Sequence, residues 1–141
     1  RSRHEVMLEN FCKVVNIEAL TMVDMARKEI IPAVSRYVKS LAETAVLMKE
    51  AVAAADSSVE CELVAKLSAL NSSALAKIKK LEAAVCGART ISGNAALAMY
   101  CKDTVIPAMN ELRIVCDECE TLTAEEFWPL PTYGDMLFGV R

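Results

Sequence analysis

A stripe of apolar residues that recurs every three or four positions through the middle of the chain limits the fold more than any other feature. It consists of Val59, Leu63, Leu67, Leu70, Ala74, Ile78, Leu81 and Val85. Because an α-helix has 3.6 residues per turn, this spacing places all of these side chains on one face. Ser57, with Glu60 three residues later, has the spacing of a capping box at the start of a helix. The pattern predicts an amphipathic helix over residues 58–86 whose apolar face other helices must cover.

Two flanking segments supply those helices. Residues 5–52 carry apolar side chains at steps of mostly three, four or seven, and residues 94–122 carry a similar stripe. Pro32 interrupts the first segment, but the apolar pattern resumes in phase beyond it, which predicts a kink instead of an end. Short connections make consecutive helices antiparallel neighbours. We therefore expect a single all-α domain, an antiparallel three-helix bundle with one very long first helix kinked at Pro32, and an extended tail over residues 123–141.

Composition supports this architecture and excludes several classes of function. Of the 141 residues, 54% are hydrophobic and 5% aromatic, with 4 Gly and 4 Pro, which suits packed helices. The 16 basic and 19 acidic residues are interspersed, so no electrostatic footprint for nucleic acid is present. No apolar run is long enough to span a membrane. The start of the chain has neither an initiator Met nor an apolar signal core, so we expect a fragment of a larger cytoplasmic protein.

The tail concentrates the aromatic and rigid residues in the stretch EFWPLPTYGDMLF. Such a segment either packs back on the helices or docks on something outside the chain. The unequal predicted lengths of the helices indicate a second docking surface, because the first ~20 residues of helix one would overhang helices two and three. Their partner would be the tail, another copy of the chain, or sequence upstream. The candidate interaction residues in the tail and the overhang are Trp128, Pro129, Pro131, Tyr133, Phe138, Met7 and Phe11.

The two internal prolines define a second candidate site. Each proline leaves a helical carbonyl without its usual donor, at Lys28 and at Asp103. If consecutive helices begin flush with one another, a polar patch of helix two falls within a turn or two of both prolines. Its side chains would then satisfy those carbonyls, directly or through water; alternatively, they form an exposed polar face. The residues at this level are Pro32, Asn71, Ser72, Ser73 and Pro107.

No sequence motif for catalysis, phosphate binding or zinc coordination is present. The six cysteines have irregular spacings, and Cys116-x-x-Cys119 is the one pair with redox or metal spacing. Both of these cysteines fall on or beside the apolar stripe of helix three, which favours core packing. From the residues alone we assign no catalytic residue and no metal ligand.

Three blocks of the sequence resemble the C-terminal region of type III glutamine synthetases. They are NIEALTMVDMARKEIIPAV (Asn16–Val34), YCKDTVIPAMNELRIVCDECETL (Tyr100–Leu122) and EFWPLPTYGDMLF. The resemblance implies a parent enzyme that joins ammonia to glutamate at the expense of ATP, with Mg²⁺ or Mn²⁺, and that forms stacked hexameric rings. The family's catalytic, ATP and metal residues lie upstream, so this chain alone is expected to be inactive and to hold no cofactor.

The leading interpretation is thus a non-catalytic structural or assembly domain whose partners are the upstream catalytic domain and neighbouring subunits. An alternative is an independent helical adaptor that recognises a partner through WPLPTYGDMLF. A third is a cysteine-based redox sensor, which requires a thiol of lowered pKa.

Overall fold

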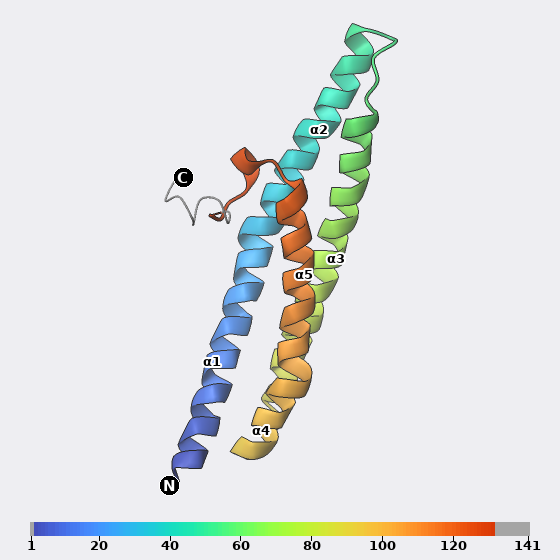
Figure 1. Cartoon of the computed structure of the whole chain (residues 1–141). Helices are drawn as coiled ribbons and strands as arrows, with labels where there is room; N and C mark the ends of the chain where they lie inside the picture. The colour runs from blue at the N-terminus through green and yellow to red at the C-terminus, as the bar shows by residue number, and fades with distance from the viewer. Residues whose placement is uncertain (1, 132–141) are drawn as a thin grey trace.

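The computed structural model describes residues 2–131, and within that range every regular element is helical (Figure 1). The first rod consists of α1 (Arg3–Met25), a π-helical turn η1 (Ala26–Ile30) and α2 (Ile31–Ala51), which follow one another without a break. After a short loop, α3 (Ser58–Ala88) returns along this rod. The long first helix and the all-α fold are therefore confirmed.

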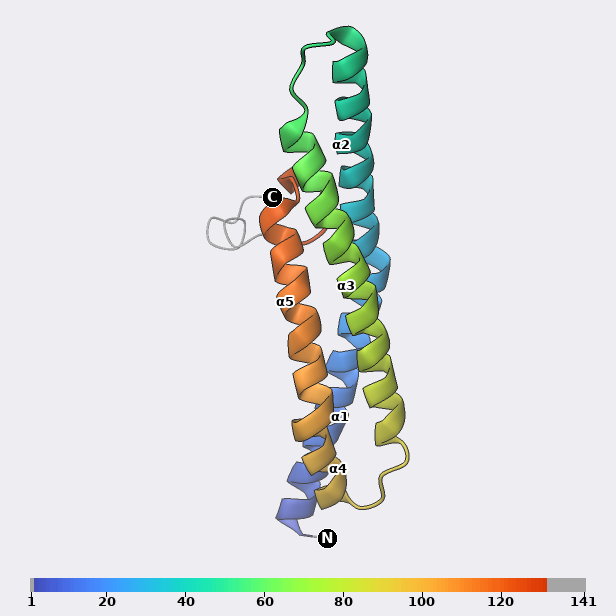
Figure 2. The same cartoon turned by 90° about the vertical axis from the view of Figure 1, so that its right-hand side faces the viewer.

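The third rod repeats the construction of the first. It consists of α4 (Asn94–Tyr100), a π-helical turn η2 (Cys101–Val105) and α5 (Ile106–Leu122), followed by one 3₁₀ turn, η3 (Glu125–Phe127). Figures 1 and 2 show α3 lying beside the first rod and α5 beside α3, so the three rods run up, down and up.

Each internal proline is the second residue after a π-helical turn. The backbone N–H of Ile31 donates to the carbonyl of Ala26, and that of Ile106 donates to the carbonyl of Cys101, five residues back in each case. A π turn accommodates one additional residue. The helix therefore continues through the proline, although proline has no N–H to donate. The interruption predicted at Pro32 thus lies in the turn before the proline, and Pro107 has the same arrangement.

The start of α3 differs from the prediction. Ser57 makes no side-chain hydrogen bond to the helix backbone, and its hydroxyl lies 3.8 Å from the Cys61 sulfur. Instead, the carboxylate of Asp56 accepts a hydrogen bond of 3.0 Å from the N–H of Ser58. The side chain and the backbone N–H of Ser58 together lower the pKa of Asp56. The capping box expected from Ser57 and Glu60 is wrong: Ser57 is the N-cap residue, but it is buried, and the side chain that accepts from the first helical N–H is that of Asp56.

The core divides into two clusters along the rods. One surrounds Ile78, Leu81 and Leu112, where α1, the second half of α3 and the third rod meet. The other surrounds Leu67 and Val34 beside the end of α5. Of the stripe that predicted α3, Leu67, Ile78 and Leu81 are fully buried, whereas Leu63 and Leu70 are half-buried.

The overhang predicted for the first half of helix one is wrong. α1 packs along α4, and Cys12 and Val15 of its first half are buried in the core. The unmatched length is instead the α2–α3 hairpin, which extends beyond the end of α5 (Figures 1 and 2). The prediction assumed that helix three begins level with the end of helix two. Instead, the turn after Ala88 places α4 beyond the end of α3 and alongside the first turns of α1.

Candidate interaction site

The tail packs back on the helices as far as the structure describes it. The Trp128 side chain is 5% exposed and belongs to the cluster around Leu67. Beside it, the Phe127 ring lies at a tilt against the Tyr37 ring of α2, with their centroids 5.3 Å apart. Leu130 also packs against this cluster. The first segment of the tail therefore closes the end of the core. Two predicted interaction residues, Tyr133 and Phe138, lie outside the described residues.

Local backbone geometry directs Trp128 towards the core. α5 ends at Leu122, and the next residue, Thr123, is extended, with φ −88° and ψ 133°. The N–H of Phe127 then donates to the carbonyl of Ala124 at 2.9 Å, and that of Trp128 to Glu125 at 3.1 Å, which closes the 3₁₀ turn. Pro129 is half-buried and Pro131 is exposed. The turn reverses the chain just after α5, so the indole returns to the cluster that α5 itself helps to form.

At Pro32, one of the three predicted polar residues contacts the first rod. The Asn71 side-chain amide donates to the carbonyl of Ile31 at 3.2 Å and to the Ser35 hydroxyl at 3.1 Å. The acceptor is thus the carbonyl beside Pro32 and not that of Lys28. Ser72 is exposed and Ser73 is half-buried.

Pro107 and Pro32 have different neighbours in the core. Val105 and Ala108, beside Pro107, belong to the cluster around Ile78, whereas Val34, two residues after Pro32, belongs to the cluster around Leu67. Ile31, next to Pro32, packs against both clusters. That the two prolines lie within a turn or two of one level stays a prediction.

Ion pairs tie α3 to both of its neighbours. The Glu111 carboxylate of α5 accepts from the ammonium groups of Lys77 at 2.8 Å and Lys80 at 2.6 Å. These two hydrogen bonds lower the pKa of Glu111 to about 2. On the opposite side, the Arg27 guanidinium donates to both carboxylate oxygens of Glu82, at 2.7 and 2.8 Å. These paired geometries set the register of α3 against the first and third rods.

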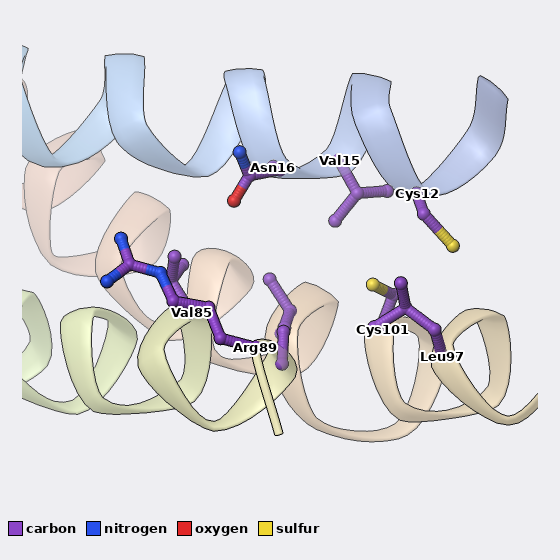
Figure 3. Close-up of a pocket in the computed structure, with 9 residues that line it drawn as sticks. Cys12, Val15, Asn16, Val85, Arg89, Leu97 and Cys101 are labelled. Atoms are coloured by element: carbon purple, nitrogen blue, oxygen red, sulfur yellow. The ribbon is translucent and has the colours of Figure 1, made fainter. Parts of the chain in front are cut away.

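A cavity of about 270 Å³ lies between α1, the end of α3 and the start of the third rod (Figure 3). Its lining is mostly apolar, and the thiols of Cys12 and Cys101 both extend into the space between α1 and the third rod. Burial, together with the neighbouring Cys12, raises the pKa of the Cys101 thiol. Arg89 and Asn16 supply the polar groups of the lining. The cavity is at the small end of the range for ligand sites, and the raised pKa of Cys101 keeps that thiol in the protonated, weakly nucleophilic form.

The remaining cysteine pair is similarly inert. Burial raises the pKa of both Cys116 and Cys119 to about 11. A redox sensor needs the opposite shift, so this pair does not support the third interpretation. Among residues 2–131 there is no group of three or more potential metal ligands. The same residues contain no helix that meets the length and hydropathy needed to cross a bilayer.

The exposed apolar residues are the remaining feature that can contact a partner. Of the two predicted in α1, Met7 is 63% exposed and Phe11 is 39% exposed. Phe11 and Leu8 border a groove between α1 and α4 that also includes Met99. The α2–α3 hairpin adds a second group at its tip: Val46, Leu47, Val52 and Val59.

The sequence is similar to those of known proteins. Residues 1–49, which include nearly all of the first rod, match the family model described as the glutamine synthetase C-terminal domain. The chain is 33% identical over 140 residues to a glutamine synthetase of Butyrivibrio fibrisolvens, with 99% of this chain and 20% of the relative covered. It is 28% identical to the type-3 glutamine synthetase of Dictyostelium discoideum, with 97% of this chain and 19% of the relative covered. The chain thus spans about a fifth of the length of these relatives.

Proposed function

Because the chain corresponds to the C-terminal domain of glutamine synthetases, type 3 enzymes among them, we propose that it is a non-catalytic domain that supports the assembly of such an enzyme. The parent reaction would join ammonia to glutamate with hydrolysis of ATP to ADP and phosphate, in the cytoplasm, with Mg²⁺ or Mn²⁺. The groups that bind those substrates and metal ions would belong to the other four-fifths of the parent. The partners of this domain would be the catalytic domain and neighbouring subunits.

One observation carries this proposal: a well-packed helical core coexists with large apolar side chains on its outside. Leu67, Ile78 and Leu112 are fully buried, so the bundle has its own core. Ile17 and Leu47 are nonetheless 63% and 61% exposed. Apolar surface that the core does not use is typical of contacts with other proteins. Rods held in register by ion pairs present such a surface rigidly, which suits a structural role.

The test is deletion of this segment from a parent glutamine synthetase that contains it. We expect the shortened enzyme to form smaller assemblies and to lose ligase activity, and the isolated 141-residue chain to show none. The measurements are particle mass by light scattering and the rate of glutamine formation. As a matched control, the parent with Ser72→Ala, a change at an exposed position, should keep both properties. Assemblies of unaltered mass with normal kinetics after deletion would refute the assembly role.

The adaptor interpretation predicts a tail that is free to bind a separate partner. The burial of Trp128 works against it, because the largest side chain of WPLPTYGDMLF already belongs to the domain core. Hydrogen exchange at the Trp128 amide distinguishes the two interpretations. Exchange slowed to the level of α5 supports the assembly domain, whereas exchange as fast as in an unfolded peptide would favour the adaptor.

A further inference from the structure

The first half of the long rod is apolar on two opposite faces. One face packs into the bundle through Cys12, Val15, Ala19 and Val23. The other face points away from it, and its residues recur with the alternating steps of three and four that define a heptad seam: Met7, Asn10, Val14, Ile17 and Thr21. Met7, Val14 and Ile17 are 63%, 52% and 63% exposed. At about 100° per residue, this seam lies roughly opposite the buried face, so a second helix can reach Val14 and Ile17 from outside the bundle.

The residues that flank the seam determine which helix fits it. In a parallel pair of identical helices, the residue just before the first seam position of each heptad (here Met7, Val14 and Thr21) approaches the residue five places later on the partner. Here those pairs are Val6 with Phe11, Lys13 with Glu18, and Leu20 with Met25. The first and last pairs are apolar with apolar, and the middle pair, Lys13 with Glu18, is basic with acidic.

An antiparallel pair would not have this complementarity. In that arrangement each flank faces the same flank of its partner, so Lys13 would approach Val6, Leu20 or another Lys13, and never Glu18. The seam also ends at the point along the rod beyond which two paired copies of the helix would separate. Asp24 and Lys28 form an exposed ion pair of 2.7 Å, and η1 then shifts the phase of the helix by one residue.

We propose that the outward face of α1, from Val6 to Met25, binds the same face of a second copy of this chain as a parallel two-fold pair. Val14 and Ile17 form the apolar centre, and Lys13 of each copy pairs with Glu18 of the other. Lys13 now pairs with Glu9 at 3.4 Å on the same helix, an exposed contact that is easily exchanged.

The seam is short, but it is already folded. About 20 residues at 1.5 Å per residue give roughly 30 Å of contact. Isolated helices of this length associate poorly because they must first form. Here the bundle holds α1 helical through its buried face, so association does not have to order the backbone. The pair is therefore weak in the free domain and strengthened where a larger assembly holds two copies together.

Sedimentation equilibrium of the 141-residue chain tests the inference without the parent enzyme. We expect the mean mass to rise from 15.4 kDa towards twice that value as the concentration increases from about 1 µM to about 1 mM, the range in which weak complexes form. Val14→Glu with Ile17→Glu should keep the mass at that of one chain. Val46→Glu with Leu47→Glu adds the same charge at positions 57% and 61% exposed on α2, and this matched control should associate like wild type.

Charge reversal tests the parallel arrangement. Lys13→Glu and Glu18→Lys should each reduce association at least tenfold, and the two together should restore it, with unchanged helix content by circular dichroism. A wild-type chain that stays monomeric throughout, or α1 and α2 variants with equal effects, would overturn the proposal. So would a chain ending at Pro131 that no longer associates, because the contact would then belong to the tail. Failed rescue would overturn the parallel pairing. None of these results bears on the deletion experiment in the parent.

Discussion

Replacing Trp128 by alanine tests whether the tail is part of the domain core. The indole is 5% exposed and contacts a cluster that contains Leu67 and Val34. Alanine would leave a void between α2, α3 and the end of α5, because rods held by ion pairs on both sides of α3 cannot easily collapse onto it.

The expected magnitude follows from the buried area. A Trp side chain buries roughly 200 Å², which at ~25 cal/mol per Å² corresponds to about 5 kcal/mol. The unfolded chain already buries part of that area, so this value is an upper estimate. Core Trp-to-Ala substitutions lower stability by roughly 3–5 kcal/mol. We therefore expect Trp128→Ala to lower the free energy of unfolding by about 3 kcal/mol and the midpoint of thermal unfolding by roughly 10 °C.

Urea unfolding followed by far-ultraviolet circular dichroism measures this loss. Leu47→Ala is the matched control: it also truncates a large apolar side chain, but one that is 61% exposed, and it should change stability by less than ~0.5 kcal/mol. A loss below about 1 kcal/mol for Trp128→Ala, or one equal to that of the control, would show that the tail is not bound in the core and would refute the reasoning.

Three further predictions concern contacts between the rods, each measured by urea unfolding. Asn71→Ala should lower stability by about 1–3 kcal/mol, because the Ile31 carbonyl loses its amide donor; Ser72→Ala, at an exposed neighbour, should have almost no effect, and equal losses would contradict the assigned bond. Gly87→Ala should lower stability by about 1 kcal/mol, because the new methyl group meets the Tyr100 hydroxyl, which donates to the Ala84 carbonyl at 2.7 Å. In a Tyr100→Phe background the same change should be nearly neutral. An undiminished loss of stability there would exclude the contact. The pKa of Glu111 is lowered from 4.5 to about 2 in the folded state, so its contribution to the free energy of unfolding is present above pH 4.5 and is lost as the pH falls towards 2. Wild type and Glu111→Gln should therefore differ in stability at pH 7 and converge near pH 2. A stability difference independent of pH would contradict the pairing with the two lysines.

The candidate surfaces could be predicted only in part. Met7 and Phe11 were identified as exposed apolar residues, but for the wrong reason, since α1 is not an overhang. Val14 belongs to the apolar pattern of the first helix, yet it is 52% exposed, because the heptad that contains it faces away from the bundle. A signal was available: at about 100° per residue, Val14 and Ile17 lie roughly opposite Val15 and Ala19, so the apolar residues of α1 form two stripes and not one. Separating two apolar stripes on one helix requires knowledge of which one the neighbours cover.

The π turns were also out of reach of sequence reasoning. A proline in a helical pattern shows that one backbone N–H donor is missing. It does not show whether the helix bends there, ends there or includes one additional residue in a wider turn. The similar segments ARKEIIPAV and CKDTVIPAM both adopt the third solution. Their likeness indicated a shared local structure, and the hydrogen bonds five residues back identified which one.

The periodicity of the apolar residues alone determined that this chain is helical, how many long rods it forms and where each turns back. These properties depend on local backbone geometry and on burying one face of each helix, which are encoded within a few turns of sequence. The displacement of the third rod, the partner of Asn71, the burial of Trp128 and the exposure of the α1 seam were decided only by the tertiary structure. They depend on how far one rod slides along another, and side chains remote in sequence determine that distance through packing and paired charges.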